Sequence, residues 1–123
     1  MSVRNLMLIA ALALAGCQTV PEAPIASTPI CRSDADCATK WAAARTYVLA
    51  HAQMKIETYS TDFLQTYNPP EYGTQLAARV NKAPMPGGEF RIEAEFWCNN
   101  LFGCSESPRQ VLDGFNRAVA SAE

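Results

Sequence analysis

The alternation of apolar and polar residues is most regular near the end of the chain, over residues 89–98. One side of this stretch carries Phe90, Ile92, Ala94, Phe96 and Cys98, and the other carries Glu89, Arg91, Glu93, Glu95 and Trp97. A strict period of two predicts a strand with one buried face and one solvated face.

Three shorter stretches predict further strands. Residues 75–82 alternate with Leu76, Ala78 and Val80 on one side, and residues 54–59 alternate apolar or small residues with polar ones. Residues 63–67 are rich in aromatic and β-branched residues and predict a returning strand. Turn-forming residues separate these stretches at positions 60–62, 68–73 and 84–88. The pattern therefore predicts an antiparallel sheet of three to four strands.

Two other stretches have helical spacing. After Ser33, which suits a helix N-cap, apolar or small residues recur at Cys37, Trp41, Ala44, Val48 and Ala52. This predicts a helix over residues 34–51. The second helix begins at Ser107-Pro108-Arg109-Gln110, which matches a capping box with proline at the first helical position. Its apolar stripe consists of Val111, Leu112, Phe115, Ala118 and Val119.

These elements predict an α+β fold, a two-layer sandwich with the order α-β-β-β-β-α. Both helices are expected on the sheet face that bears Ile56, Val80, Phe90, Ile92 and Phe96, because this is the simplest way to bury all three apolar surfaces. The opposite face of the sheet would then stay open.

The N-terminal residues have a different composition. Arg4 precedes a run of ten apolar residues, Leu6–Ala15, which is too short to span a bilayer about 30 Å thick. A positive end, an apolar run and small residues are typical of a signal peptide, here over residues 1–16. Residues 17–30 contain Pro21, Pro24 and Pro29 and predict an extended tether, followed by a domain over residues 31–123.

The signal-like segment ends in Leu14-Ala15-Gly16-Cys17, which resembles the lipobox of bacterial lipoproteins. The resemblance implies that Cys17 receives a diacylglyceryl thioether and becomes the acylated first residue of the mature chain. Gln18, in place of Asp, implies sorting to the outer membrane, with the domain in the periplasm. The stretches Met54–Tyr59 and Cys98–Cys104 also resemble small uncharacterised Gram-negative envelope lipoproteins, and this likeness implies no known activity.

Four further cysteines form two pairs with the same spacing, Cys31 with Cys37 and Cys98 with Cys104. An even number of cysteines in an exported chain predicts two disulfides rather than a zinc site, which prefers shorter spacing between paired ligands. Four cysteines allow three pairings. Local pairing is preferred because each pair flanks the start of one predicted helix.

Charge and chemistry narrow the classes of function. Without residues 1–16 the chain has a net charge near −3 and no run of basic residues, which argues against binding nucleic acid. His51 is the only histidine, and no cluster of ligands or activated nucleophile accompanies it. Glu93 and Glu95 would lie about 6.5–7 Å apart on an open strand face, where solvation and arginine partners explain them better than acid–base catalysis. We therefore expect no enzyme activity, no metal and no cofactor.

The open sheet face is the candidate binding surface. It would carry Tyr59, Arg79, Arg91, Glu93, Glu95 and Trp97, together with Lys55 and Glu57. Large exposed aromatic residues are enriched at binding sites, although Trp97 could instead pack under the loop at 68–73. The sequence thus predicts a lipid-anchored module that binds an envelope protein or the cell wall. The alternative is an inhibitor or immunity protein whose loop at 68–73 blocks a hydrolase or toxin.

Overall fold

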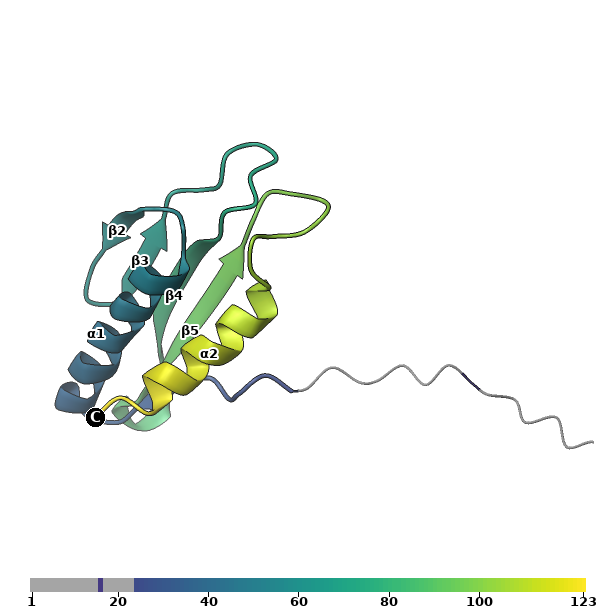
Figure 1. Cartoon of the computed structure of the whole chain (residues 1–123). Helices are drawn as coiled ribbons and strands as arrows, with labels where there is room; N and C mark the ends of the chain where they lie inside the picture. The colour runs from purple at the N-terminus through teal and green to yellow at the C-terminus, as the bar shows by residue number, and fades with distance from the viewer. Residues whose placement is uncertain (1–15, 17–23) are drawn as a thin grey trace, which may run out of the picture.

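The computed structural model describes residues 16 and 24–123. Within them, a five-stranded antiparallel sheet with strand order β1-β5-β4-β3-β2 packs against two helices (Figure 1). The elements are β1 (Ile30–Cys31), α1 (Asp34–His51), β2 (Ile56–Tyr59), β3 (Phe63–Thr66), β4 (Ala77–Pro84), the 3-10 helix η1 (Pro86–Gly88), β5 (Phe90–Trp97) and α2 (Pro108–Ala120). The predicted α+β class is confirmed, with one strand more than the three to four expected.

The helix starts follow from local chemistry. The hydroxyl of Ser33 accepts the backbone N–H of Asp36 over 3.1 Å, and the hydroxyl of Ser107 accepts that of Gln110 over 3.3 Å. Each cap satisfies a donor that the first helical turn leaves without a partner. Pro108 stands where its missing N–H costs nothing.

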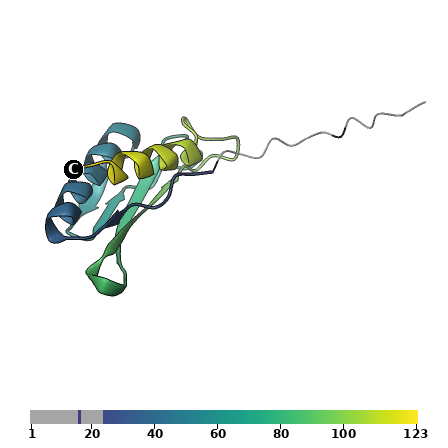
Figure 2. The same ribbon diagram turned by 90° about the horizontal axis from the view of Figure 1, so that it is seen from below.

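Both helices cover the same face of the sheet, as Figure 2 shows from below. The core includes α1 residues Trp41, Ala44 and Val48, α2 residues Val111, Phe115 and Val119, and strand residues Leu64, Ala78, Val80, Ile92 and Phe96. Within it, the rings of Phe96 and Phe115 meet edge to face with centroids 5.9 Å apart. This is the two-layer arrangement that the apolar patterns predict, and it leaves the other sheet face open.

The first strand was not expected. Ile30 and Cys31 pair with Arg91 and Phe90 at the edge of β5, and the N–H of Ile92 donates to the Pro29 carbonyl. The predicted tether over residues 17–30 therefore overlaps the fold at its C-terminal end. Proline-rich sequence obscured the strand, although an edge strand tolerates proline because one side of its backbone needs no partner.

The segment before β1 is hydrogen-bonded to α2. The Ala26 N–H donates to the Asp113 carboxylate over 2.8 Å, and the Asn116 side-chain amide donates to the Ala26 carbonyl over 2.8 Å. Both partners belong to α2, so this segment runs along the helix before it enters the sheet. Seven residue steps separate Pro24 from Cys17, a span of at most about 25 Å.

The two disulfides are the local pairs that the sequence favoured. Cys31–Cys37 joins the edge strand to the first turn of α1, with Cα atoms 4.9 Å apart. Cys98–Cys104 closes the loop between β5 and α2, with Cα atoms 5.7 Å apart. Cys31 is completely buried in the core. The first disulfide therefore also packs the core, whereas the second braces a loop.

Candidate binding surfaces

Five of the six residues predicted to form a binding surface lie together on the open face of the sheet. Arg79 of β4 is directly opposite Glu95 of β5, with 3.7 Å between guanidinium and carboxylate, and the same guanidinium lies 5.5 Å from the ring centroid of Trp97. The Nε of Arg79 donates to the Gln65 side chain over 3.4 Å. Arg79 thus links a neighbouring strand, a carboxylate and the half-buried Trp97.

The other pair on this face lies further along β5. Arg91 and Glu93 are 3.0 Å apart, and both side chains remain about half exposed. Ion pairs this exposed contribute little to stability. The carboxylates of Glu93 and Glu95 are each paired with an arginine on an open surface, so they have no enclosed cleft in which to act as an acid–base pair.

Tyr59 does not belong to this surface, which corrects the sequence prediction. The pairing of β2 with β3 shifts between Ile56 and Thr58, and Tyr59 then lies opposite Leu64, whose side chain is in the core. The ring of Tyr59 stacks on that of Trp41 with centroids 6.3 Å apart, on the helix side of the sheet. The extra residue of a β-bulge reverses the facing of the residues after it, and a strict alternation of two does not anticipate this.

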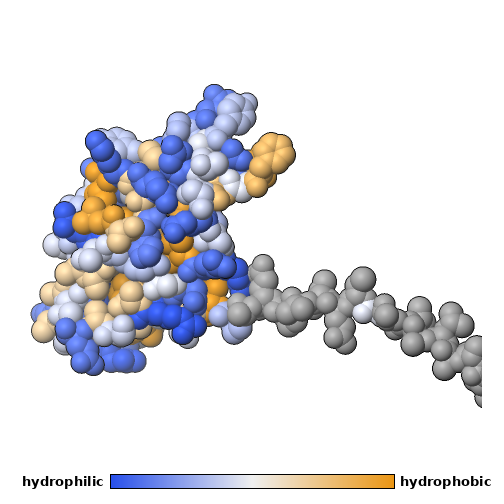
Figure 3. Space-filling view, viewed as in Figure 1, coloured by the Kyte–Doolittle hydropathy of each residue, from blue (hydrophilic) through white to orange (hydrophobic). Residues whose placement is uncertain are grey.

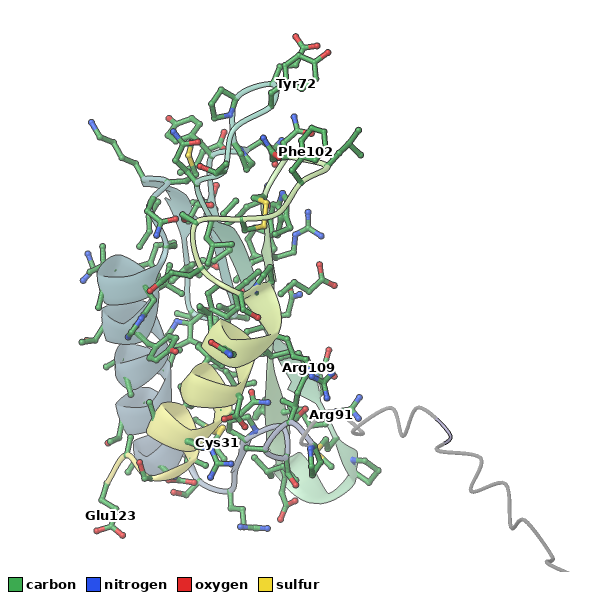
Figure 4. All side chains as sticks on the ribbon, turned by 45° about the vertical axis from the view of Figure 1, so that its right-hand side comes forward. Cys31, Tyr72, Arg91, Phe102, Arg109 and Glu123 are labelled. Atoms are coloured by element: carbon green, nitrogen blue, oxygen red, sulfur yellow. A yellow bond between two sulfur atoms is a disulfide. The ribbon has the colours of Figure 1, made fainter. Side chains whose placement is uncertain are left out.

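A second surface lies at one end of the molecule, where two loops project side by side (Figure 1). One loop connects β3 to β4, and the other connects β5 to α2. We call their three outermost large side chains, Tyr72, Leu101 and Phe102, the tip. Tyr72 is 72% exposed, Leu101 is 96% exposed and Phe102 is fully exposed. Figure 4 shows Tyr72 and Phe102 at the same end of the molecule, and Figure 3 shows one hydrophobic projection there beside a separate, more hydrophilic one.

Backbone hydrogen bonds join the two loops to each other. The N–H of Asn99 donates to the Gly73 carbonyl over 3.0 Å, and that of Ser105 donates to the Thr74 carbonyl over 2.9 Å. The Asn100 side chain donates to the Tyr72 carbonyl over 2.8 Å. The Cys98–Cys104 disulfide closes one loop, and these hydrogen bonds join that loop to the other. The two loops therefore support the tip as one connected structure.

The backbone at the tip is held in a less common conformation. Tyr72 has a positive φ of 59°, which is unusual for a residue other than glycine. Its neighbour Gly73 has no room for a side chain, because an added Cβ would lie 2.8 Å from Pro70. Local strain of this kind persists only where the surroundings enforce it. The aromatic side chain of Tyr72 is therefore presented outward at an energetic cost.

The sequence analysis did not identify Leu101 and Phe102, because residues 99–103 predict only a tight connection. One signal was present: an apolar pair inside a loop, between two asparagines and a glycine. Side chains of this kind each gain about 1.5–3 kcal/mol when they leave water, and here no residue of the described part of the chain covers them. Large apolar side chains gathered at one exposed place are typical of interaction sites.

His51 lies in a polar pocket of about 490 Å³ with Tyr47, Ser105, Glu106 and Ser107. Its ring stacks on that of Tyr47, with centroids 4.0 Å apart. Ser107 caps α2 and Ser105 donates to the Gln53 side chain, so neither hydroxyl is aligned with the imidazole as a nucleophile.

Burial, with the nearby Glu106 and Asp113 carboxylates, raises the pKa of Tyr47. Its hydroxyl donates to the Val111 carbonyl over 2.8 Å and so ties α1 to α2. The position of Tyr47 is thus explained by packing between the helices.

Among residues 16 and 24–123, no three potential metal ligands cluster, and no helix combines the length and apolarity needed to cross a bilayer. Cys17, the predicted lipidation site, lies outside these residues. The chain matches no model of a protein family, no curated protein and no solved structure.

Proposed function

We propose that this chain is a lipid-anchored lipoprotein of the cell envelope, and that its domain is a non-catalytic module that binds a partner through the tip. The observation that carries the proposal is the full exposure of Leu101 and Phe102 on a loop closed by a disulfide. A rigid loop loses little conformational entropy on binding, so more of the gain from burying these side chains appears as affinity.

The anchor is proposed from the lipobox resemblance at Leu14–Cys17. Two disulfides are consistent with folding in an oxidising compartment such as the periplasm. Two or three acyl chains on Cys17 would hold the protein permanently at the membrane, because one chain alone binds only marginally. The short span from Cys17 to Pro24 keeps the domain close to that membrane. Gln18 favours the outer membrane, with the domain in the periplasm.

The absence of catalysis is proposed from how the chemical groups are used. Glu93 and Glu95 are paired with arginines on an open face, and the serines near His51 serve as a cap and a loop contact. A general base needs a substrate proton within reach and a nucleophile needs an aligned partner. The polar groups described above have structural partners instead.

A second candidate is an inhibitor or immunity protein that blocks a periplasmic hydrolase or toxin. The observation that favours it is that two loops joined by hydrogen bonds project from the same end of the domain. Such a projection is suited to insertion into the cleft of a hydrolase. An effector-like gene beside the gene for this chain would favour this candidate over a module that binds another envelope protein or the wall.

Site-specific photocrosslinking from the full-length protein in cells tests the binding role. A photoreactive phenylalanine derivative is placed at position 102, and a matched control is placed at position 49, where Leu49 is 56% exposed on α1. The proposal predicts a discrete adduct from position 102 that is not formed from position 49. No adduct from position 102, or the same adduct from both positions, contradicts it.

A further inference from the structure

We infer that the tip inserts into a preformed apolar pocket of a folded protein, and that cationic groups line the rim of this pocket. The inference rests on the proposed binding function and specifies the partner for the same surface.

The shape of the tip favours a pocket over a flat surface. Leu101 and Phe102 are adjacent in one loop, and Tyr72 comes from the neighbouring loop, whose backbone is tied to the first by Asn99 and Asn100. The adjacent Leu101 and Phe102 side chains, on a loop whose backbone is bonded to its neighbour, are suited to filling one concave site with Tyr72 beside it. Such anchors in fully desolvated pockets provide most of the affinity at protein interfaces.

The charged residues near the tip favour a protein over a lipid bilayer as its partner. Residues 67–76 and 98–107, which form the two loops, contain Glu71 next to Tyr72 and Glu106 at the base of the second loop, and no lysine or arginine. Lys55 lies at the base of the first loop, where its carbonyl accepts the Tyr67 N–H. Both glutamates are exposed. A bilayer surface that carries anionic lipids repels such loops, whereas cationic groups around a protein pocket attract them.

The test uses the full-length lipidated protein with the photocrosslinker at position 102. The adduct is examined for sensitivity to proteases and to wall-degrading enzymes, and its yield is compared among variants. The inference predicts a protein adduct whose yield falls at least tenfold in Leu101→Ser. It also predicts that the yield falls several-fold in Glu71→Lys and is unchanged in Glu57→Lys, a matched reversal of an exposed charge on β2. Raising the salt concentration should reduce the effect of Glu71→Lys, since screening weakens the attraction.

A second measurement addresses the bilayer directly. The same proteins carrying Cys17→Ser, which cannot be lipidated there, are mixed with vesicles of phosphatidylethanolamine and phosphatidylglycerol at three to one. The inference predicts no flotation that depends on Leu101 or Phe102. Flotation that is lost in Leu101→Ser would show that the tip binds lipid and not a protein pocket. A glycan adduct, or equal yields from Glu71→Lys and Glu57→Lys, would also overturn the inference while leaving a binding function in place. No adduct from position 102 would remove the proposed function itself.

Discussion

The side-chain amide of Asn100 donates to the backbone carbonyl of Tyr72 over 2.8 Å, across the gap between two loops that are 28 residues apart in sequence. The carbonyl oxygen of the same side chain accepts the N–H of Phe102 over 2.9 Å. One asparagine therefore fixes the backbone at two of the three tip residues. The tip depends on this side chain for its geometry, although Asn100 contributes no apolar surface of its own.

Asn100→Ala should loosen the tip without unfolding the domain. Losing two partly solvated hydrogen bonds should cost roughly 1 kcal/mol of unfolding free energy. The backbone amide of Phe102 should exchange with deuterium several-fold faster than in the wild type, while the amide of Ile92, which is bonded to Pro29, keeps its rate. Exchange at Phe102 that stays unchanged would show that Asn100 does not hold the loop.

Phe102 and Phe115 should respond very differently to truncation. Phe115 is completely buried and Phe102 is fully exposed. Phe115→Ala should cost about 3–5 kcal/mol because it leaves a cavity, whereas Phe102→Ser should change the free energy of unfolding by less than about 0.5 kcal/mol. Urea unfolding followed by tryptophan fluorescence measures both. A large loss of unfolding free energy in Phe102→Ser would mean that this side chain packs against the fold. It would then not be available to bind a partner.

The two disulfides should differ in what they stabilise. Each closes a loop of similar length, worth about 2 kcal/mol on the chain-entropy model. Replacing Cys98 and Cys104 by serine should cost about that amount. Replacing Cys31 and Cys37 by serine should cost more, because a hydroxyl at the completely buried Cys31 lacks a partner in the core. Equilibrium unfolding of the two double variants gives the order, and the reverse order would contradict the assignment of Cys31–Cys37 to the core.

Acid should weaken the fold through two carboxylates. A hydrogen bond from Lys40, and then one from the Arg32 backbone, lowers the pKa of Asp36 below its ordinary 3.8. Hydrogen bonds from Arg117 and from the Ala26 backbone likewise lower the pKa of Asp113. Because the folded-state pKa values are depressed, their contribution is complete above the unfolded-state value. It is lost as the pH falls from about 4 through the folded-state values.

The variant Asp36→Asn/Asp113→Asn should therefore be less stable than the wild type at neutral pH and should lose less stability on acidification. Urea unfolding at a series of pH values from 6 down to 2.5 measures the two slopes. Parallel slopes for the wild type and the double variant would show that these carboxylates do not couple folding to pH.

The sequence predicted most of the fold because local and global signals agreed. The caps at Ser33 and Ser107 and the alternation over residues 89–98 each specify an element on their own, and the apolar faces leave one simple way to stack the layers. The wrong placement of Tyr59 came from a bulge, which depends on how β2 pairs with β3 and not on β2 alone. The strand at Ile30–Cys31 depends on pairing with a segment 60 residues away.

The candidate site was less predictable for a related reason. Arg79, Arg91, Glu93, Glu95 and Trp97 were placed correctly on one face by alternation. The tip, in contrast, exists only because hydrogen bonds bring together Tyr72 and the Leu101–Phe102 pair from two loops. No periodicity describes such loops, and an apolar pair in a connection does not reveal whether the fold will cover it.

The account depends most on Cys17 being the acylated first residue of the mature protein. Metabolic labelling with palmitate, followed by intact-mass analysis of the membrane-bound protein, tests this directly. The account predicts a labelled chain that begins at Cys17 and carries acyl groups, and no label in Cys17→Ser. An unlabelled wild-type chain, or equal labelling of Cys17→Ser, would contradict it.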